Sequence, residues 1–131
     1  MSALRSFRRP RLWLGVWIFG WGLCIALSLI PNPPIPTEVP EGDKIGHILA
    51  YALLSIWAVL IFDSRAARWR AAWALVGLGV VLEVAQGTLT AYRSMDAFDG
   101  LADAFGVVLG QCLAWSSAQT ALQRWDRRWF P

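Results

Sequence analysis

The chain has 131 residues, which is enough for one domain, and its formal net charge is +3. It is 56% hydrophobic and 16% charged, whereas about a quarter of the residues of a soluble domain are charged. This composition argues against a soluble domain and favours a membrane protein.

Four apolar segments divide the chain. Each is close to the roughly 20 residues that a helix needs to cross about 30 Å of hydrocarbon at a rise of about 1.5 Å per residue. We therefore predict an all-α fold: a polytopic membrane protein built as a compact bundle of four transmembrane helices, within a single domain of residues 1–131. The predicted spans are residues 12–30, 45–62, 71–89 and 100–118.

The first span carries no charged residue, and Trp13, Trp17 and Trp21 recur on one face of it. Its small residues allow neighbouring helices to approach closely, so we expect a scaffold helix. The segment that follows, residues 31–43, contains five of the seven prolines. Because proline lacks an amide donor and disfavours helix before it, this segment is expected to be an extended loop outside the cytoplasm.

The second span begins with polar residues. Asp43, His47 and Tyr51 are four residues apart, which places them in one column on a helix, and Lys44 follows Asp43 directly. A histidine in this position either belongs to a binding site or forms a polar contact with a neighbouring helix. Asp43 also fits a plain helix N-cap.

The third span carries Glu83 about 18 Å above its start, in the outer half of the hydrocarbon, with Gln86 one turn further on nearly the same face. An ionised glutamate at that depth costs several kcal/mol, so Glu83 must be protonated or paired. His47, Lys44 and Arg93 are the candidate partners. We expect coupling with Arg93, because it is the nearest cation in the sequence.

The fourth span carries a stripe of three acids followed by two glycines. Steps of three, four, three and four residues place these positions on one face of a helix. Lipid cannot accommodate such a stripe, since intramembrane acids face the protein interior or a water-filled cavity, and glycines four apart favour close helix packing. The stripe consists of Asp96, Asp99, Asp103, Gly106 and Gly110.

The basic residues predict the topology. Ten of the twelve lysines and arginines fall on one side of the four-span arrangement, and only Lys44 and Arg93 fall on the other. The positive-inside rule then places both termini in the cytoplasm of a multi-pass protein of the inner (cytoplasmic) membrane. Basic clusters of this kind contact anionic membrane lipids, not nucleic acid. The Arg- and Trp-rich tail, residues 119–131, is expected to lie along the membrane surface.

Polar residues from three separate stretches meet at the outer end of this arrangement. In chain order they form D-K-x-x-H-x-x-x-Y, E-x-x-Q, R-x-x-D-x-x-D and G-x-x-x-G. Over roughly residues 31–110 this series resembles the VanZ-like family of small integral membrane proteins. The family often has Asn-Thr where this chain has Asp103-Ala104, which adds a negative charge here. The predicted site comprises Asp43, Lys44, His47, Tyr51, Glu83, Gln86, Arg93, Asp96, Asp99 and Asp103.

The resemblance implies a membrane domain of the kind linked to resistance to teicoplanin-type glycopeptide antibiotics. We expect it to bind an amphipathic or lipid-linked envelope molecule by its head group, with Lys44, His47 and Arg93 facing anionic groups. The alternatives are an intramembrane enzyme that uses His, Glu and Asp for acid–base or metal chemistry, an ion pathway, and a purely structural polar core. No close-spaced metal motif such as H-E-x-x-H occurs, so neither a metal ion nor a cofactor is expected.

Overall fold

The computed structural model describes residues 3–31 and 42–131, so the loop predicted over residues 31–43 lies almost entirely outside the described residues. Within that part of the chain, five α-helices are joined by turns and two 3-10 segments. Their bounds are α1 Pro10–Leu29, α2 Gly42–Ile61, α3 Arg65–Leu89, α4 Ala97–Gln111, η1 Cys112–Trp115, η2 Ser117–Thr120 and α5 Ala121–Trp129.

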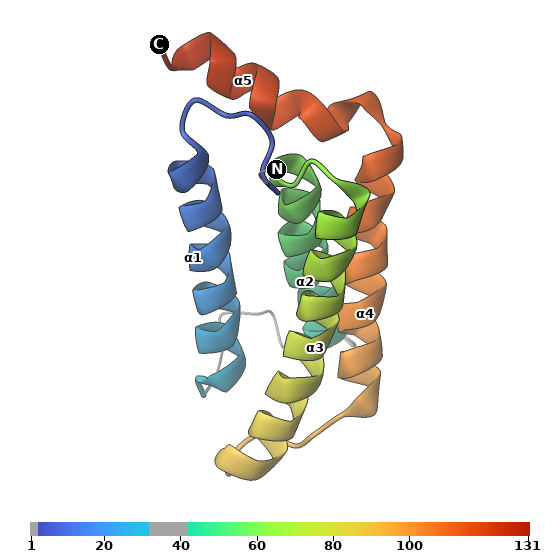
Figure 1. Cartoon of the computed structure of the whole chain (residues 1–131). Coiled ribbons are helices and arrows are strands. Elements are labelled where there is room, and N and C mark those ends of the chain that lie inside the picture. The colour runs from blue at the N-terminus through green and yellow to red at the C-terminus, as the bar shows by residue number, and fades with distance from the viewer. Residues whose placement is uncertain (1–2, 32–41) are drawn as a thin grey trace.

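Four helical stretches in the described part of the chain are each long and apolar enough to cross a membrane: α1, α2, α3, and Ala97–Trp115, which consists of α4 and η1. Figure 1 shows them side by side as a bundle, with α1 standing somewhat apart from the other three. The predicted all-α bundle with four helices of membrane-spanning length is therefore confirmed.

Two of the described helices have other bounds than the predicted spans. The third helix begins at Arg65 and not at residue 71, because the Ser64 side chain caps it by accepting a hydrogen bond of 3.1 Å from the amide of Ala67. The fourth span ends at Trp115 and not at residue 118, because the helix tightens into η1 and Ser116 then adopts extended backbone. A polar cap thus sets the start of α3, and a change of backbone conformation sets the end of the fourth helix; apolarity alone reveals neither.

The closest helix pair is α2 against α4, and the two glycines of the predicted stripe make it possible. A Cβ atom on Gly110 would lie 2.5 Å from Ser55 Cβ and 2.6 Å from the Ala52 carbonyl oxygen, and one on Gly106 would collide with the Ile48 carbonyl oxygen. Small residues allow this approach between helices in lipid. The close packing brings the acids of α4 within reach of the start of α2.

The tryptophan face of α1 turns toward α2. The indole of Trp17 donates to the carbonyl of Leu54 at 3.0 Å, and the indole of Trp57 donates to the carbonyl of Trp13 at 3.1 Å. Each bond satisfies a polar indole N–H inside an apolar bundle, where an unpaired donor is costly. These contacts hold α1 beside the rest of the bundle, as expected for a scaffold helix.

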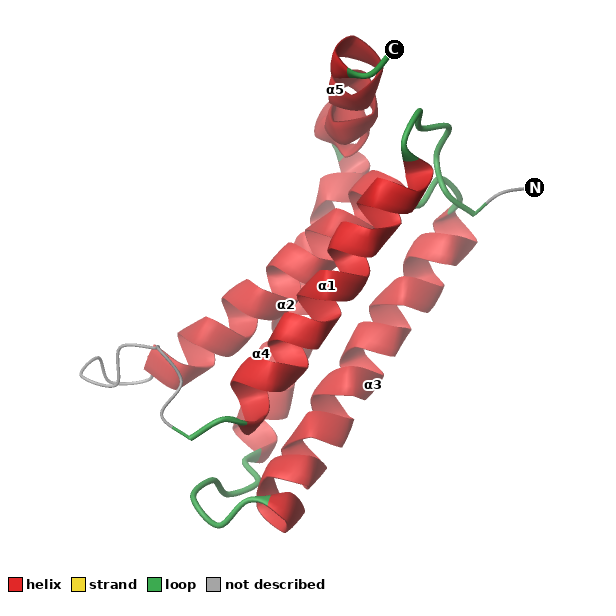
Figure 2. Cartoon of the chain, turned by 90° about the vertical axis from the view of Figure 1, so that its left-hand side faces the viewer, coloured by secondary structure: helices red, strands yellow, loops and turns green. Residues whose placement is uncertain are grey.

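The two termini lie at the same end of the bundle, and α5 crosses that end (Figures 1 and 2). Asp126 of α5 is fully buried. It accepts hydrogen bonds from the Trp13 indole at 2.7 Å and from the amides of Arg8 and Arg9 at 2.5 and 3.3 Å. An acid in a basic tail thus ties the tail to the start of α1, a contact that the sequence analysis does not predict.

Candidate functional site

The predicted polar residues gather at the end of the bundle opposite the termini (Figure 1). They come from the start of α2, the end of α3, the loop that follows it, and the start of α4. The structure joins eight of the ten through ion pairs, hydrogen bonds or close approach: Asp43, Lys44, His47, Glu83, Arg93, Asp96, Asp99 and Asp103.

His47 and Asp103 form the innermost pair of this cluster. His47 Nδ1 lies 2.8 Å from Asp103 Oδ1, within hydrogen-bond distance, and the Asp103 side chain is 2% exposed. Gly79 of α3 provides the space for this carboxylate, since a Cβ atom at Gly79 would lie 2.7 Å from Asp103 Oδ2. The buried acid is therefore paired with a residue of α2 while it packs against α3.

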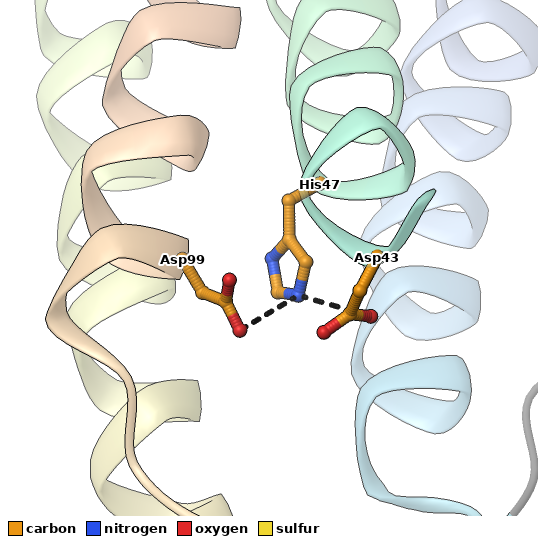
Figure 3. A group of neighbouring side chains, drawn as sticks. All are labelled: Asp43, His47 and Asp99. Carbon is orange, nitrogen blue, oxygen red and sulfur yellow. Dashed lines mark ion pairs between the residues drawn. The ribbon is translucent and has the colours of Figure 1, made fainter. Parts of the chain in front are cut away.

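The other ring nitrogen of His47 points between two further acids. His47 Nε2 lies 3.8 Å from Asp99 Oδ2 and 4.0 Å from Asp43 Oδ1 (Figure 3). Asp99 is nearly as buried as Asp103, whereas the side chain of Asp43 is 46% exposed. The imidazole is thus surrounded by three carboxylates, one of which opens to the exterior.

The two permanent cations of this end are paired with acids of the protein itself. Lys44 Nζ lies 3.4 Å from Asp96 Oδ2 and 3.5 Å from Asp99 Oδ1, and Arg93 Nη2 lies 3.2 Å from Asp43 Oδ1. With Glu83 and Asp103 the cluster has five carboxyl groups for one lysine, one arginine and one histidine. Carboxylate oxygens therefore outnumber cations, and hydrogen-bond acceptors dominate the site.

Glu83 has a different partner from the one predicted. Its Oε2 accepts from the amide of Asp96 at 3.0 Å, whereas Arg93 reaches Asp43 on α2. The reason is the path of the chain: α3 ends at Leu89, and the loop returns over Glu83 to begin α4. The second oxygen of Glu83, Oε1, is buried without a hydrogen-bond partner among the described residues.

Tyr51 and Gln86 lie outside the ionic cluster. The Gln86 amide donates to the Ser28 carbonyl oxygen at 2.8 Å and so attaches α3 to α1. Tyr51 packs in the hydrophobic core with Leu54 and Leu75. The Tyr51 hydroxyl is buried without a hydrogen-bond partner among the described residues.

A small cavity of about 170 Å³ opens beside the cluster, between α1 and α2. Its wall is mostly apolar, and the polar groups of Asp43, His47 and Arg93 lie at its edge. The α1 side of this wall could not be predicted, because the first span carries no charged residue that would indicate a site. The lining consists of Cys24, Leu27, Ser28, Asp43, Gly46, His47, Ala50, Tyr51 and Arg93.

The cluster also offers donor sets for a metal ion or for proton transfer. Two groups have ligand atoms within 4.8 Å of one another: Asp43 with His47 and Asp99, and His47 with Glu83 and Asp103. Carboxylates and imidazole are the usual ligands of divalent ions. A histidine oriented by a buried carboxylate is equally the usual arrangement of a general base.

Sequence reasoning missed Gly79, although a signal for it is present. Gly79 precedes Glu83 by four residues, so the two share one face of α3. A glycine on the polar face of a helix opposite an acidic stripe indicates that a side chain of the partner helix needs its space. Asp103 occupies that space.

Comparison of the chain with protein-family models, with curated proteins and with solved structures found no match. The resemblance to the VanZ-like family therefore rests on the motif residues alone.

The first prediction concerns the buried pair. Replacement of His47 by alanine leaves Asp103 buried and unpaired, so it should lower the free energy of unfolding by about 3–5 kcal/mol. The double variant His47→Ala/Asp103→Ala should lose less than the sum of the two single variants. Unfolding of the micelle-embedded protein by SDS titration measures both quantities.

The matched control is Asp43→Ala, which removes a half-exposed acid of the same cluster and should cost less than about 1 kcal/mol. Strict additivity of the His47 and Asp103 variants would contradict the pairing.

Proposed function

We propose that the chain is a multi-pass protein of the inner (cytoplasmic) membrane, with both termini in the cytoplasm and the acidic cluster at the extracytoplasmic face. The support is the charge asymmetry, with ten basic residues on the side of the termini and only Lys44 and Arg93 on the other. Lys44 and Arg93 are themselves paired with acids of the cluster.

At this outer face the protein binds an amphipathic or lipid-linked envelope molecule by its head group, in an accessory role like that of the VanZ-like proteins it resembles. The observation that carries this proposal is the cavity of about 170 Å³ with its mixed lining. Leu27 and Ala50 offer apolar surface to a chain, while Asp43, His47 and Arg93 offer polar groups to a head group. Binding sites commonly combine an apolar wall with a few placed polar groups.

The chemistry of the cluster defines the kind of head group. Carboxylate oxygens are in excess, so hydroxyl or ammonium donors of the ligand find acceptors at Asp43, which is the most exposed acid of the cluster. The Arg93 guanidinium has five N–H donors, and its Nη2 donates to Asp43. Its remaining donors suit a carbonyl or an anionic oxygen. A head group with both donors and acceptors, such as a sugar or a peptide, fits this wall best.

An intramembrane enzyme is the second candidate. It is favoured by the buried oxygen Glu83 Oε1 without a hydrogen-bond partner among the described residues, next to the His47–Asp103 pair. In this role His47 would exchange protons with a substrate on its Nε2 side, oriented by Asp103. If the polar cluster is purely structural, changes in the cavity should not affect ligand binding. The binding experiment below therefore separates a structural role from a binding role.

The topology is tested by cysteine labelling. In a variant without Cys24 and Cys112, a single cysteine at Ser94, an exposed position of the loop between α3 and α4, should react with an impermeant maleimide added to intact cells. A single cysteine at Ala66, exposed at the start of α3, should react only after the membrane is opened. The reverse pattern would overturn the topology.

The binding site is tested with teicoplanin, an acylated glycopeptide, and with its deacylated core as a non-amphipathic counterpart. The full chain in nanodiscs should bind teicoplanin at least tenfold more tightly than the core. Filling the cavity with Ala50→Trp, or removing its polar wall with Asp43→Asn/Arg93→Gln, should reduce this affinity by on the order of tenfold, since one lost charged hydrogen bond contributes about 1.5–3 kcal/mol. Microscale thermophoresis measures the affinities.

The matched control for the cavity is Leu49→Trp, which adds an indole to an outward-facing position of the same helix. It should leave binding unchanged. Equal binding of teicoplanin and its core, or full binding by both site variants, would refute the proposed site.

A further inference from the structure

A second and larger cavity, of about 410 Å³, lies toward the opposite end of the molecule, between α3 on one side and α4 with η1 on the other. We infer that this groove binds one anionic phospholipid, with its phosphate at the basic end and an acyl chain along the groove. The inference does not rest on the proposed function, because no residue is shared between the two sites. The lining consists of Arg65, Arg68, Trp69, Ala72, Trp73, Val76, Val107, Val108, Gln111, Ala114 and Trp115.

The length of the groove matches one leaflet of a bilayer. Arg65 and Val76 mark its two ends on α3, and the helix rises about 16 Å between them. Half of a hydrocarbon core of about 30 Å is about 15 Å. With the arginines at the level of the lipid head groups, the groove therefore ends near the middle of the membrane, which is where a single acyl chain ends.

The charge of the groove favours a negative head group. Arg65 and Arg68 line its mouth, and no acid is among the described residues of its wall. The acid nearest in sequence, Asp63, pairs with Arg5 at 3.0 Å. The Arg68 guanidinium is held by the Gln119 side chain at 2.8 Å, which leaves its other donors for a ligand. Arginine binds phosphate oxygens in a bidentate manner.

The floor and rim of the groove have the shapes that a lipid requires. Ala72 and Val107 are buried and, with Val76, give the groove an apolar inner wall of small side chains, against which an acyl chain can lie. Trp69 and Trp73 stand at the rim and are 46% and 69% exposed. Indoles prefer the membrane–water interface, so these residues fix the depth at which the groove meets the head groups.

Native mass spectrometry tests this inference on the full chain in micelles, with dioleoyl phosphatidylglycerol and dioleoyl phosphatidylcholine added in equal amounts. The wild type should retain phosphatidylglycerol in preference. In Arg65→Gln/Arg68→Gln the affinity for phosphatidylglycerol should fall on the order of thirtyfold, because each basic residue near an anionic surface contributes a factor of about five. The affinity for phosphatidylcholine should fall by a smaller factor, because its head group has the same phosphate but its choline cation cancels the net charge.

The matched control is Arg11→Gln/Arg70→Gln, which removes the same charge from exposed positions outside the groove and should keep the preference. Val108→Trp fills the groove without a change of charge, so it should weaken binding of both lipids even if the arginine variant fails to fold. Three results would overturn the inference: no preference in the wild type, an equal loss in both arginine variants, or a stable dimer that Val108→Trp disrupts.

Discussion

The polar end of this protein depends on one requirement: an acid buried among apolar helices must have a partner. An isolated charge there costs several kcal/mol, and Asp103 meets this requirement through the hydrogen bond of 2.8 Å from His47 on α2. That bond needs α2 and α4 to lie very close together, which Gly106 and Gly110 allow, and it needs space on α3, which Gly79 supplies. The charge pair therefore depends on three glycines, one on α3 and two on α4.

The two ends of the bundle carry opposite chemistry and different cavities. At one end, acids exceed cations, and a small cavity joins polar groups of α2 to apolar residues of α1. At the other end, arginines line a larger groove along α3 and α4. The helix α1 lines the small cavity. Indole–carbonyl hydrogen bonds and the Gln86–Ser28 hydrogen bond hold it beside α2 and α3. A scaffold helix therefore becomes one wall of the candidate site.

Much of this organisation follows from the sequence, because hydrocarbon imposes strict rules on it. Apolar length predicts the four spans, and the three-four spacing predicts a stripe whose members Asp99, Asp103, Gly106 and Gly110 are buried in the structure. Asp96 does not belong to this stripe, because it caps α4 with extended backbone and its side chain is partly exposed. The contact partners of individual polar side chains cannot be predicted from the sequence in this way. The pairing of Glu83 with Arg93 was wrong because proximity in sequence does not fix the path of a loop, and the contacts of Asp126 join segments more than 110 residues apart.

The protonation of His47 determines whether Asp103 is paired, and the chain contains only one histidine. Nitrogen-15 NMR of histidine-labelled protein in nanodiscs therefore gives the signals of this imidazole alone. If His47 is paired with Asp103, its Nδ1 should be protonated and the hydrogen-bonded proton should exchange slowly. This signal should move in Asp103→Asn and stay unchanged in Asp126→Asn, which alters a buried acid at the other end of the bundle. A freely exchanging imidazole whose signals are unchanged in Asp103→Asn would show that the two side chains are not paired.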